Sequence, residues 1–222
     1  MFDRLNRALH QNQQAPQVRQ PTIESLLPGD VISFWDSGDC VVQAVLECHE
    51  ELNRRETVWR WNVLDDGRLL EVGPDGTILY ERTDVLHQDS VEFETLTSDP
   101  AQGGVLKAFE ARVRQGTAAR QPTLFEYGGS VYRVVSTGMF DARPLGETVY
   151  PNLPVWRDIN PTDTGDNVYF GLEPTTDVPP GESGTEVLGV WTTHIALLFG
   201  RTINSADVQS IYPRAEQEGG TH

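Results

Sequence analysis

Residues 57–81 read TVWRWNVLDDGRLLEVGPDGTILYE, and this stretch decides the fold class. Three short segments rich in aliphatic and aromatic residues are separated by Asp65-Asp-Gly67 and by Gly73-Pro-Asp-Gly76. Turns that contain Asp and Gly between such segments are the strongest short-range signal for β-hairpins. Residues 57–81 are therefore predicted to form an antiparallel meander of three strands.

The residues before this meander continue the pattern. A turn at residues 26–30 precedes a predicted strand at 31–35, and a tight turn at 36–39 leads into a predicted strand at 40–48. The even separation of Cys40 and Cys48 places both thiols on one face of that strand, at opposite ends. They are too far apart to form a disulfide there, so the sequence predicts buried, unpaired cysteines rather than a metal site.

The pattern changes between residues 98 and 121 and then starts again. Val105, Phe109 and Val113 repeat every four residues, and Gly116 is placed to end a helix. From residue 123 onward the order of strand, turn and strand returns, with Gly128-Gly129 in the turn. One helix is therefore predicted between two β-rich parts of the chain.

The two β-rich parts match in the order and spacing of their motifs. Residues 31–46 correspond to 124–137, Val58-Trp59-Arg60 corresponds to Val155-Trp156-Arg157, and Arg68–Glu71 corresponds to Phe170–Glu173. We expect a mainly β protein, of α+β type with few helices, in which two homologous antiparallel barrel- or sandwich-like halves are joined by one helix. The predicted units are an N-terminal arm and linker (1–21), a first β-rich repeat (22–98), the connecting helix (99–121), a second β-rich repeat (122–214) and a flexible tail (215–222).

Short motifs occur in a fixed order along residues 22–213. They are Leu27-Pro-Gly-Asp-Val-Ile32, Val41-Val42, Trp59 with Leu64, Leu69-Leu-Glu-Val72, Tyr127-Gly-Gly-Ser-Val-Tyr-Arg133, Val155-Trp156-Arg157, Tyr169-Phe-Gly-Leu-Glu173, Gly200-Arg-Thr-Ile203 and Asp207-Val208. In this order they resemble the bacterial family called domain of unknown function 4178. The resemblance implies a β-rich fold and a link to bacterial membrane-stress proteins, and it supplies no activity and no catalytic residue.

Composition narrows the classes of function. The chain of 222 residues has 33 acidic and 17 basic residues, for a formal net charge of −16. Nucleic-acid binding depends on basic groups, so this balance disfavours it. The first ten residues lack the apolar core of a secretory signal, and no apolar run is long enough to span a membrane. We expect a cytoplasmic protein that does not span a membrane.

The tryptophans are the first candidates for a site. Trp59 and Trp61 share one face of a predicted strand with Arg60 on the other, and Trp156 and Arg157 repeat this pair in the second half. One interpretation is a binding groove between the halves, because aromatic and arginine residues are enriched at binding hot spots. The other is that the tryptophans form the core while the arginines pair with glutamates such as Glu71 and Glu173.

No common catalytic motif is present, and neither a cofactor nor a metal is expected. Acidic turns such as Asp65-Asp66 follow the backbone preference of hairpins for Asp. The sequence therefore favours a non-catalytic accessory or interaction protein, with another protein or a membrane-associated assembly as partner. Two alternatives use a cleft between the halves: a small enzyme in which His194 meets Glu186 or Asp207, and a sensor of a small ligand.

Overall fold

The computed structural model describes residues 19–52, 54–146, 167–175 and 186–214, and most of the predicted arm and tail lie outside these ranges. Its strands are β1 (Val31–Phe34), β2 (Gly38–Leu52), β3 (Arg55–Leu64), β4 (Leu69–Gly73), β5 (Gly76–Leu86), β6 (Leu124–Tyr127), β7 (Ser130–Pro144), β8 (Asn167–Pro174), β9 (Glu186–Trp191), β10 (Ile195–Ile203) and β11 (Val208–Tyr212). The α-helices are α2 (Val91–Thr97) and α3 (Val105–Arg114), with short 3-10 helices at Ile23–Ser25 and Pro100–Gln102. The prediction of a mainly β fold with few helices is confirmed.

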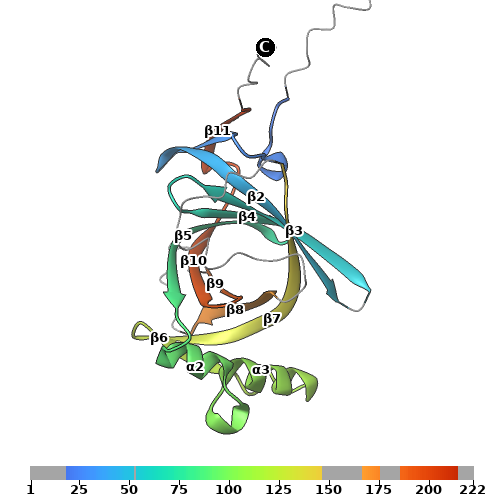
Figure 1. Cartoon of the computed structure of the whole chain (residues 1–222), viewed down its shortest axis with the longest axis vertical. Coiled ribbons are helices and arrows are strands. Elements are labelled where there is room, and N and C mark those ends of the chain that lie inside the picture. Colours follow the sequence, from blue (N-terminus) through green and yellow to red (C-terminus); the bar gives the residue numbers. More distant parts are fainter. Residues whose placement is uncertain (1–18, 53, 147–166, 176–185, 215–222) are drawn as a thin grey trace, which may run out of the picture.

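Eight antiparallel strands close into one barrel (Figure 1). They pair in the order β2-β3-β4-β5-β10-β9-β8-β7, and β7 pairs with β2 to complete the ring. Strands β1 and β11 extend the sheet beyond β2, and β6 extends it beyond β7. Each half of the chain therefore contributes four strands to the barrel, and strand pairs between the halves close it at β5–β10 and at β2–β7.

This closure differs from the expected arrangement of two separate barrel- or sandwich-like halves. Pairing between the halves satisfies strand edges that each half would otherwise expose. The sequence matches residues 170–173 to residues 68–71, most of which lie in β4. The structure places them in β8, which pairs with β7 as β3 pairs with β2, so they correspond in position to β3. The helical connection contains α2 as well as the predicted helix, which the structure places at α3. Homology of the two halves stays a prediction.

A β-bulge in β2 corrects the prediction for the two cysteines. The register of β2 against β3 shifts between Val42 and Ala44, which reverses the side-chain alternation beyond that point. Cys40 packs in the cluster beneath β1, whereas Cys48 packs inside the barrel. Both are buried and unpaired as predicted, but the expectation that they share one face is wrong because of the extra residue.

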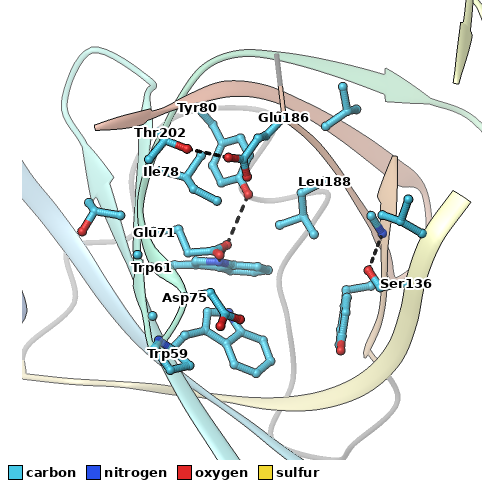
Figure 2. A pocket seen from close by; sticks show the side chains of 18 of the residues that line it. Trp59, Trp61, Glu71, Asp75, Ile78, Tyr80, Ser136, Glu186, Leu188 and Thr202 are labelled. Carbon is cyan, nitrogen blue, oxygen red and sulfur yellow. Dashed lines mark hydrogen bonds between the residues drawn. The ribbon is translucent and has the colours of Figure 1, made fainter. Parts of the chain in front are cut away.

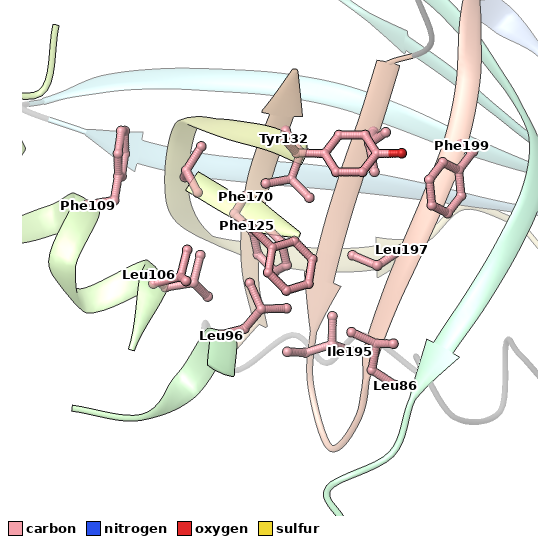
Figure 3. Packing of buried hydrophobic residues seen from close by; sticks show 14 residues of the cluster. Leu86, Leu96, Leu106, Phe109, Phe125, Tyr132, Phe170, Ile195, Leu197 and Phe199 are labelled. Atoms are coloured by element: carbon pink, nitrogen blue, oxygen red, sulfur yellow. The ribbon is translucent and has the colours of Figure 1, made fainter. Parts of the chain in front are cut away.

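Helices α2 and α3 cover part of the outer face of the barrel. Figure 3 shows Leu96 and Leu106 from the helices beside Phe125, Phe170 and Ile195 from β6, β8 and β10. Strand β10 is buried on both faces, because its alternate residues point to this layer and into the barrel. None of the described helices has the length and apolar character needed to cross a membrane.

Candidate functional site

One end of the barrel interior is hollow. The cavity has a volume of about 680 Å³, and all eight barrel strands contribute to its wall. Figure 2 shows Trp59 and Trp61 from β3, Glu71 from β4, Tyr80 from β5 and Leu188 from β9 around this space. The lining passes from buried residues such as Trp61 and Tyr80 to exposed ones such as Asp75, so the cavity opens near the β4–β5 turn.

The other end of the interior is filled. Apolar side chains pack there in one cluster that includes Ala44, Val63, Leu69, Phe140 and Leu198. Leu198 is completely buried, and Phe140 is 1% exposed. The cavity therefore has a packed apolar floor and a polar mouth.

Glu71 is the most unusual side chain in the cavity. The Nε1–H group of Trp61 donates to its Oε2 atom at 2.9 Å, and the hydroxyl of Tyr80 donates to the same atom at 3.4 Å. Burial raises the pKa of the Glu71 carboxyl, and the nearby carboxylates of Glu186 and Asp75 raise it further, against the opposing effect of these two hydrogen bonds. Glu71 is thus an acid in a largely apolar surrounding, without a positive partner among the described residues.

Further acids surround the mouth. Glu186 accepts a hydrogen bond from the Thr202 hydroxyl at 2.6 Å, and Glu50 accepts one from the Tyr169 hydroxyl at 2.9 Å. Burial and the neighbouring Glu50 raise the pKa of Tyr169, so this hydroxyl keeps its proton. The described lining contains no Lys, Arg or His.

Aromatic rings form one wall. The ring centroids of Trp59 and Tyr169 lie 5.9 Å apart with their planes nearly perpendicular, and Trp59 and Trp61 both contact Phe140 at 5.5 and 5.2 Å. These contacts fix the orientation of the indoles, because aromatic rings prefer edge-to-face or offset arrangements to a face-to-face sandwich. The site therefore combines rigid aromatic surfaces with carboxylates.

The structure separates the members of the predicted aromatic groove. Trp59 and Trp61 share the inner face of β3 as expected, and Arg60 points outward, where it pairs with Glu47 at 3.2 Å and donates to the carbonyl of Glu24. Arg60 does not pair with Glu71, the partner expected if the tryptophans formed the core. Trp156 and Arg157 lie outside the described residues.

The predicted enzyme set does not converge. His194 lies in the turn between β9 and β10, where its ring contacts that of His87 at a centroid distance of 4.8 Å. Glu186 is at the opposite end of β9, and Asp207 lies beyond β10, 3.9 Å from Arg201. The pattern of residues 189–199 predicts one continuous alternation, but the chain reverses at residues 192–194, which moves His194 away from both acids.

Cys40, Asp65 and Asp66 form a cluster with ligand atoms close enough to share a metal ion. Arg68 already occupies it, because its guanidinium donates to Asp66 at 2.6 Å and to the Cys40 sulfur at 2.8 Å. Burial raises the pKa of Cys40 to about 11, which keeps the thiol protonated at neutral pH. The cluster is best described as a structural ion pair.

Glu71 was missed as a site residue, although one signal was present. It stands between Leu70 and Val72, and the inward residue before it on the strand, Leu69, is buried. A glutamate inside such an apolar run is unusual, since charged residues are rarely buried without a partner. The apolar neighbours of Glu71 along the chain are therefore the signal that could have identified it.

A scan of protein-family models found no match to this chain, and searches among curated proteins and among solved structures found none either. The resemblance to the domain of unknown function 4178 therefore stays a prediction. The geometry of the cavity is the basis on which a function can be proposed.

Proposed function

We propose that this protein is a non-catalytic accessory protein that holds a small organic molecule inside its barrel. The carrying observation is the cavity of about 680 Å³ lined by residues of all eight strands. Pockets for small ligands have volumes of roughly 300–1,000 Å³, with apolar walls and a few polar groups. Eight-stranded barrels are wide enough for one small ligand.

The arrangement of the walls supports binding rather than an empty packing defect. A defect would leave an apolar void, whereas this cavity presents Glu71, Glu186 and the ring of Trp59 toward the same space (Figure 2). The proposal retains the small-ligand alternative of the sequence analysis and moves the ligand from a cleft between halves to the inside of one barrel. A protein partner, a membrane-associated assembly and a cytoplasmic location stay predictions.

A cavity-filling variant tests this proposal. Leu188→Trp places an indole in the hollow end and leaves every carboxylate in place. Saturation-transfer NMR with small amines, alcohols, amides and carboxylic acids should detect at least one chemical class that binds the full chain and is lost in the variant. Ile78→Trp, on β5, which β10 separates from β9, serves as the second variant if Leu188→Trp unfolds. Binding unchanged in a folded variant, or no binding by any class, would refute the proposal.

A second candidate function is acid–base catalysis by Glu71 and Glu186. One observation favours it: burial raises the pKa of Glu71, and an acid of raised pKa near a second carboxylate is the pattern used in glycoside hydrolysis. Turnover of chromogenic glycosides by the full chain, lost in both Glu71→Gln and Glu186→Gln, would establish this activity. Absence of turnover across such a panel would leave the binding function as the better account.

A further inference from the structure

The charged side chains of the cavity lining are all acidic within the described residues. They are Glu50, Glu71, Asp75, Glu173 and Glu186. Of these acids, only Glu173 forms an ion pair, with Arg133, within the described part of the chain. A cleft of one charge sign with low-dielectric walls concentrates ligands of the opposite sign. The charge of the lining therefore selects cations.

The hydrogen bonds of the lining lead to the same conclusion. Several polar side chains of the wall already donate to its acids: Trp61 and Tyr80 to Glu71, Tyr169 to Glu50, and Thr202 to Glu186. Both donors to Glu71 meet its Oε2 atom, which leaves Oε1 without a donor among the described residues. The oxygen lone pairs that remain free on these carboxylates can only accept hydrogen bonds, so a ligand group that fits here must donate them.

The aromatic wall adds a third contribution. Indole faces attract ammonium groups through their quadrupole, and tryptophan does so best. Trp59 and Trp61 lie on the same inner face of β3 and border the space beside Glu71 (Figure 2). A neutral sugar would also stack on an indole, but its hydroxyls need donors in the wall as well as acceptors. Four donors of the wall, on Trp61, Tyr80, Tyr169 and Thr202, are already bound to its carboxylates, which favours a ligand that donates hydrogen bonds over one that also needs to accept them.

We infer that the ligand of this cavity is a small organic cation, whose ammonium group is held by Glu71 and Glu186 beside the indoles of Trp59 and Trp61 and whose apolar part packs on the same rings. This inference rests on the proposed binding function. A bound ammonium supplies the positive partner that Glu71 lacks in the described chain, and a charge-assisted hydrogen bond to a carboxylate is about twice as strong as a neutral one.

Three probes of similar shape test the charge of the ligand. Phenethylammonium, 2-phenylethanol and 3-phenylpropanoate share an aromatic ring and a short chain and differ mainly in the charge of the end group. Isothermal titration calorimetry with the full chain should show binding of the ammonium ion, about tenfold or more weaker binding of the alcohol, and no binding of the carboxylate. Ammonium affinity should fall as salt rises, because salt screens the attraction.

Matched variants locate the interaction. Glu71→Gln keeps an acceptor oxygen for Trp61 and Tyr80 but removes the charge, and should weaken ammonium binding about tenfold or more. Glu110→Gln removes the same charge from the exposed surface of α3 and should change affinity less than about twofold, because surface charges there are screened. If Glu71 had only a structural role, Glu71→Gln would weaken binding of the ammonium ion and of the alcohol to the same extent.

The outcomes separate the inference from the proposed function. Selective ammonium binding, lost in Glu71→Gln and in Leu188→Trp, supports both. Binding of the alcohol or the carboxylate that is equal to or stronger than that of the ammonium ion, and lost in Leu188→Trp, overturns the cation and keeps the binding function. Failure of all three probes to bind overturns the inference, and the wider NMR panel then decides whether the cavity binds any other class.

Discussion

The two ends of the barrel interior are built from the same strands and have opposite characters. On β4 the inward residue Leu69 is 1% exposed in the packed end, and the next inward residue, Glu71, borders the cavity. On β10, Leu198 fills the floor and Thr202 lies at the mouth. Because successive inward positions change from apolar to polar, the packed end supplies stability and the other end is available for binding.

The largest expected effect comes from replacing a leucine by alanine at each end of the interior, in two separate variants. Leu198→Ala should lower the free energy of unfolding by about 2–5 kcal/mol, because it leaves a cavity in a filled core. Leu188→Ala should cost about 1 kcal/mol or less, since its side chain is partly exposed and already borders open space. Urea unfolding of the two variants measures the difference. Equal losses would mean that the hollow end is as tightly packed as the floor.

Glu71→Gln should stabilise the ligand-free protein at neutral pH. Burial, with Glu186 and Asp75 nearby, raises the pKa of Glu71 in the folded state, so the folded chain binds this proton more tightly than the unfolded chain. The stability that Glu71 contributes is therefore present at acidic pH and is lost as pH rises through its folded pKa. We expect a melting temperature about 2–4 °C above that of the wild type at neutral pH, which corresponds to roughly 1 kcal/mol for a chain of this size.

The pH series provides its own control. At pH values below the usual pKa range of glutamate, both proteins carry a neutral side chain at position 71, and their melting temperatures should converge. Differential scanning calorimetry between acidic and neutral pH follows this convergence. A gain in melting temperature that is the same at every pH would contradict this assignment. An effect that arises from the charge of Glu71 must disappear once the wild-type carboxyl is protonated.

The smallest effect is expected at the compensated acid of the lining. Glu173 pairs with Arg133, and both side chains are 53% exposed, so solvent screens the pair. Arg133→Ala should change the free energy of unfolding by about 0–1 kcal/mol, with less effect at high salt. Chemical denaturation at low and high salt measures it. A loss above about 2 kcal/mol would show that this ion pair supports the fold as strongly as the floor residues do.

Local features of the fold followed from the sequence. The turns at residues 65–67 and 73–76 lie where their Asp and Gly residues predicted, and Gly67 adopts a φ of 93°, which glycine tolerates best. Helix α2 was missed because it is short, although Ser90 accepts a hydrogen bond from the Phe93 amide as a typical N-cap. Closure of the barrel was not predictable, since β2–β7 and β5–β10 join strands that are distant in the sequence.

The site was predicted only in part. The shared face of Trp59 and Trp61 follows from their spacing, because side chains alternate along a strand. Their position inside a cavity depends on where the ring closes and on bulges, which local patterns do not encode. One of the two interpretations of the sequence pairs Glu71 with an arginine, whereas the structure places it beside indole and phenol groups.

The bulge in β2 has a chemical consequence for its two thiols. Burial raises the pKa of Cys40 to about 11 and that of Cys48 well above its usual value, so neither thiol reacts while its surroundings are closed. Because the bulge assigns them to different layers, Cys40 becomes reactive when the layer under β1 opens and Cys48 when the barrel interior opens. The rates at which a thiol reagent labels the two positions therefore measure two separate opening motions of the chain, and no cysteine has to be introduced.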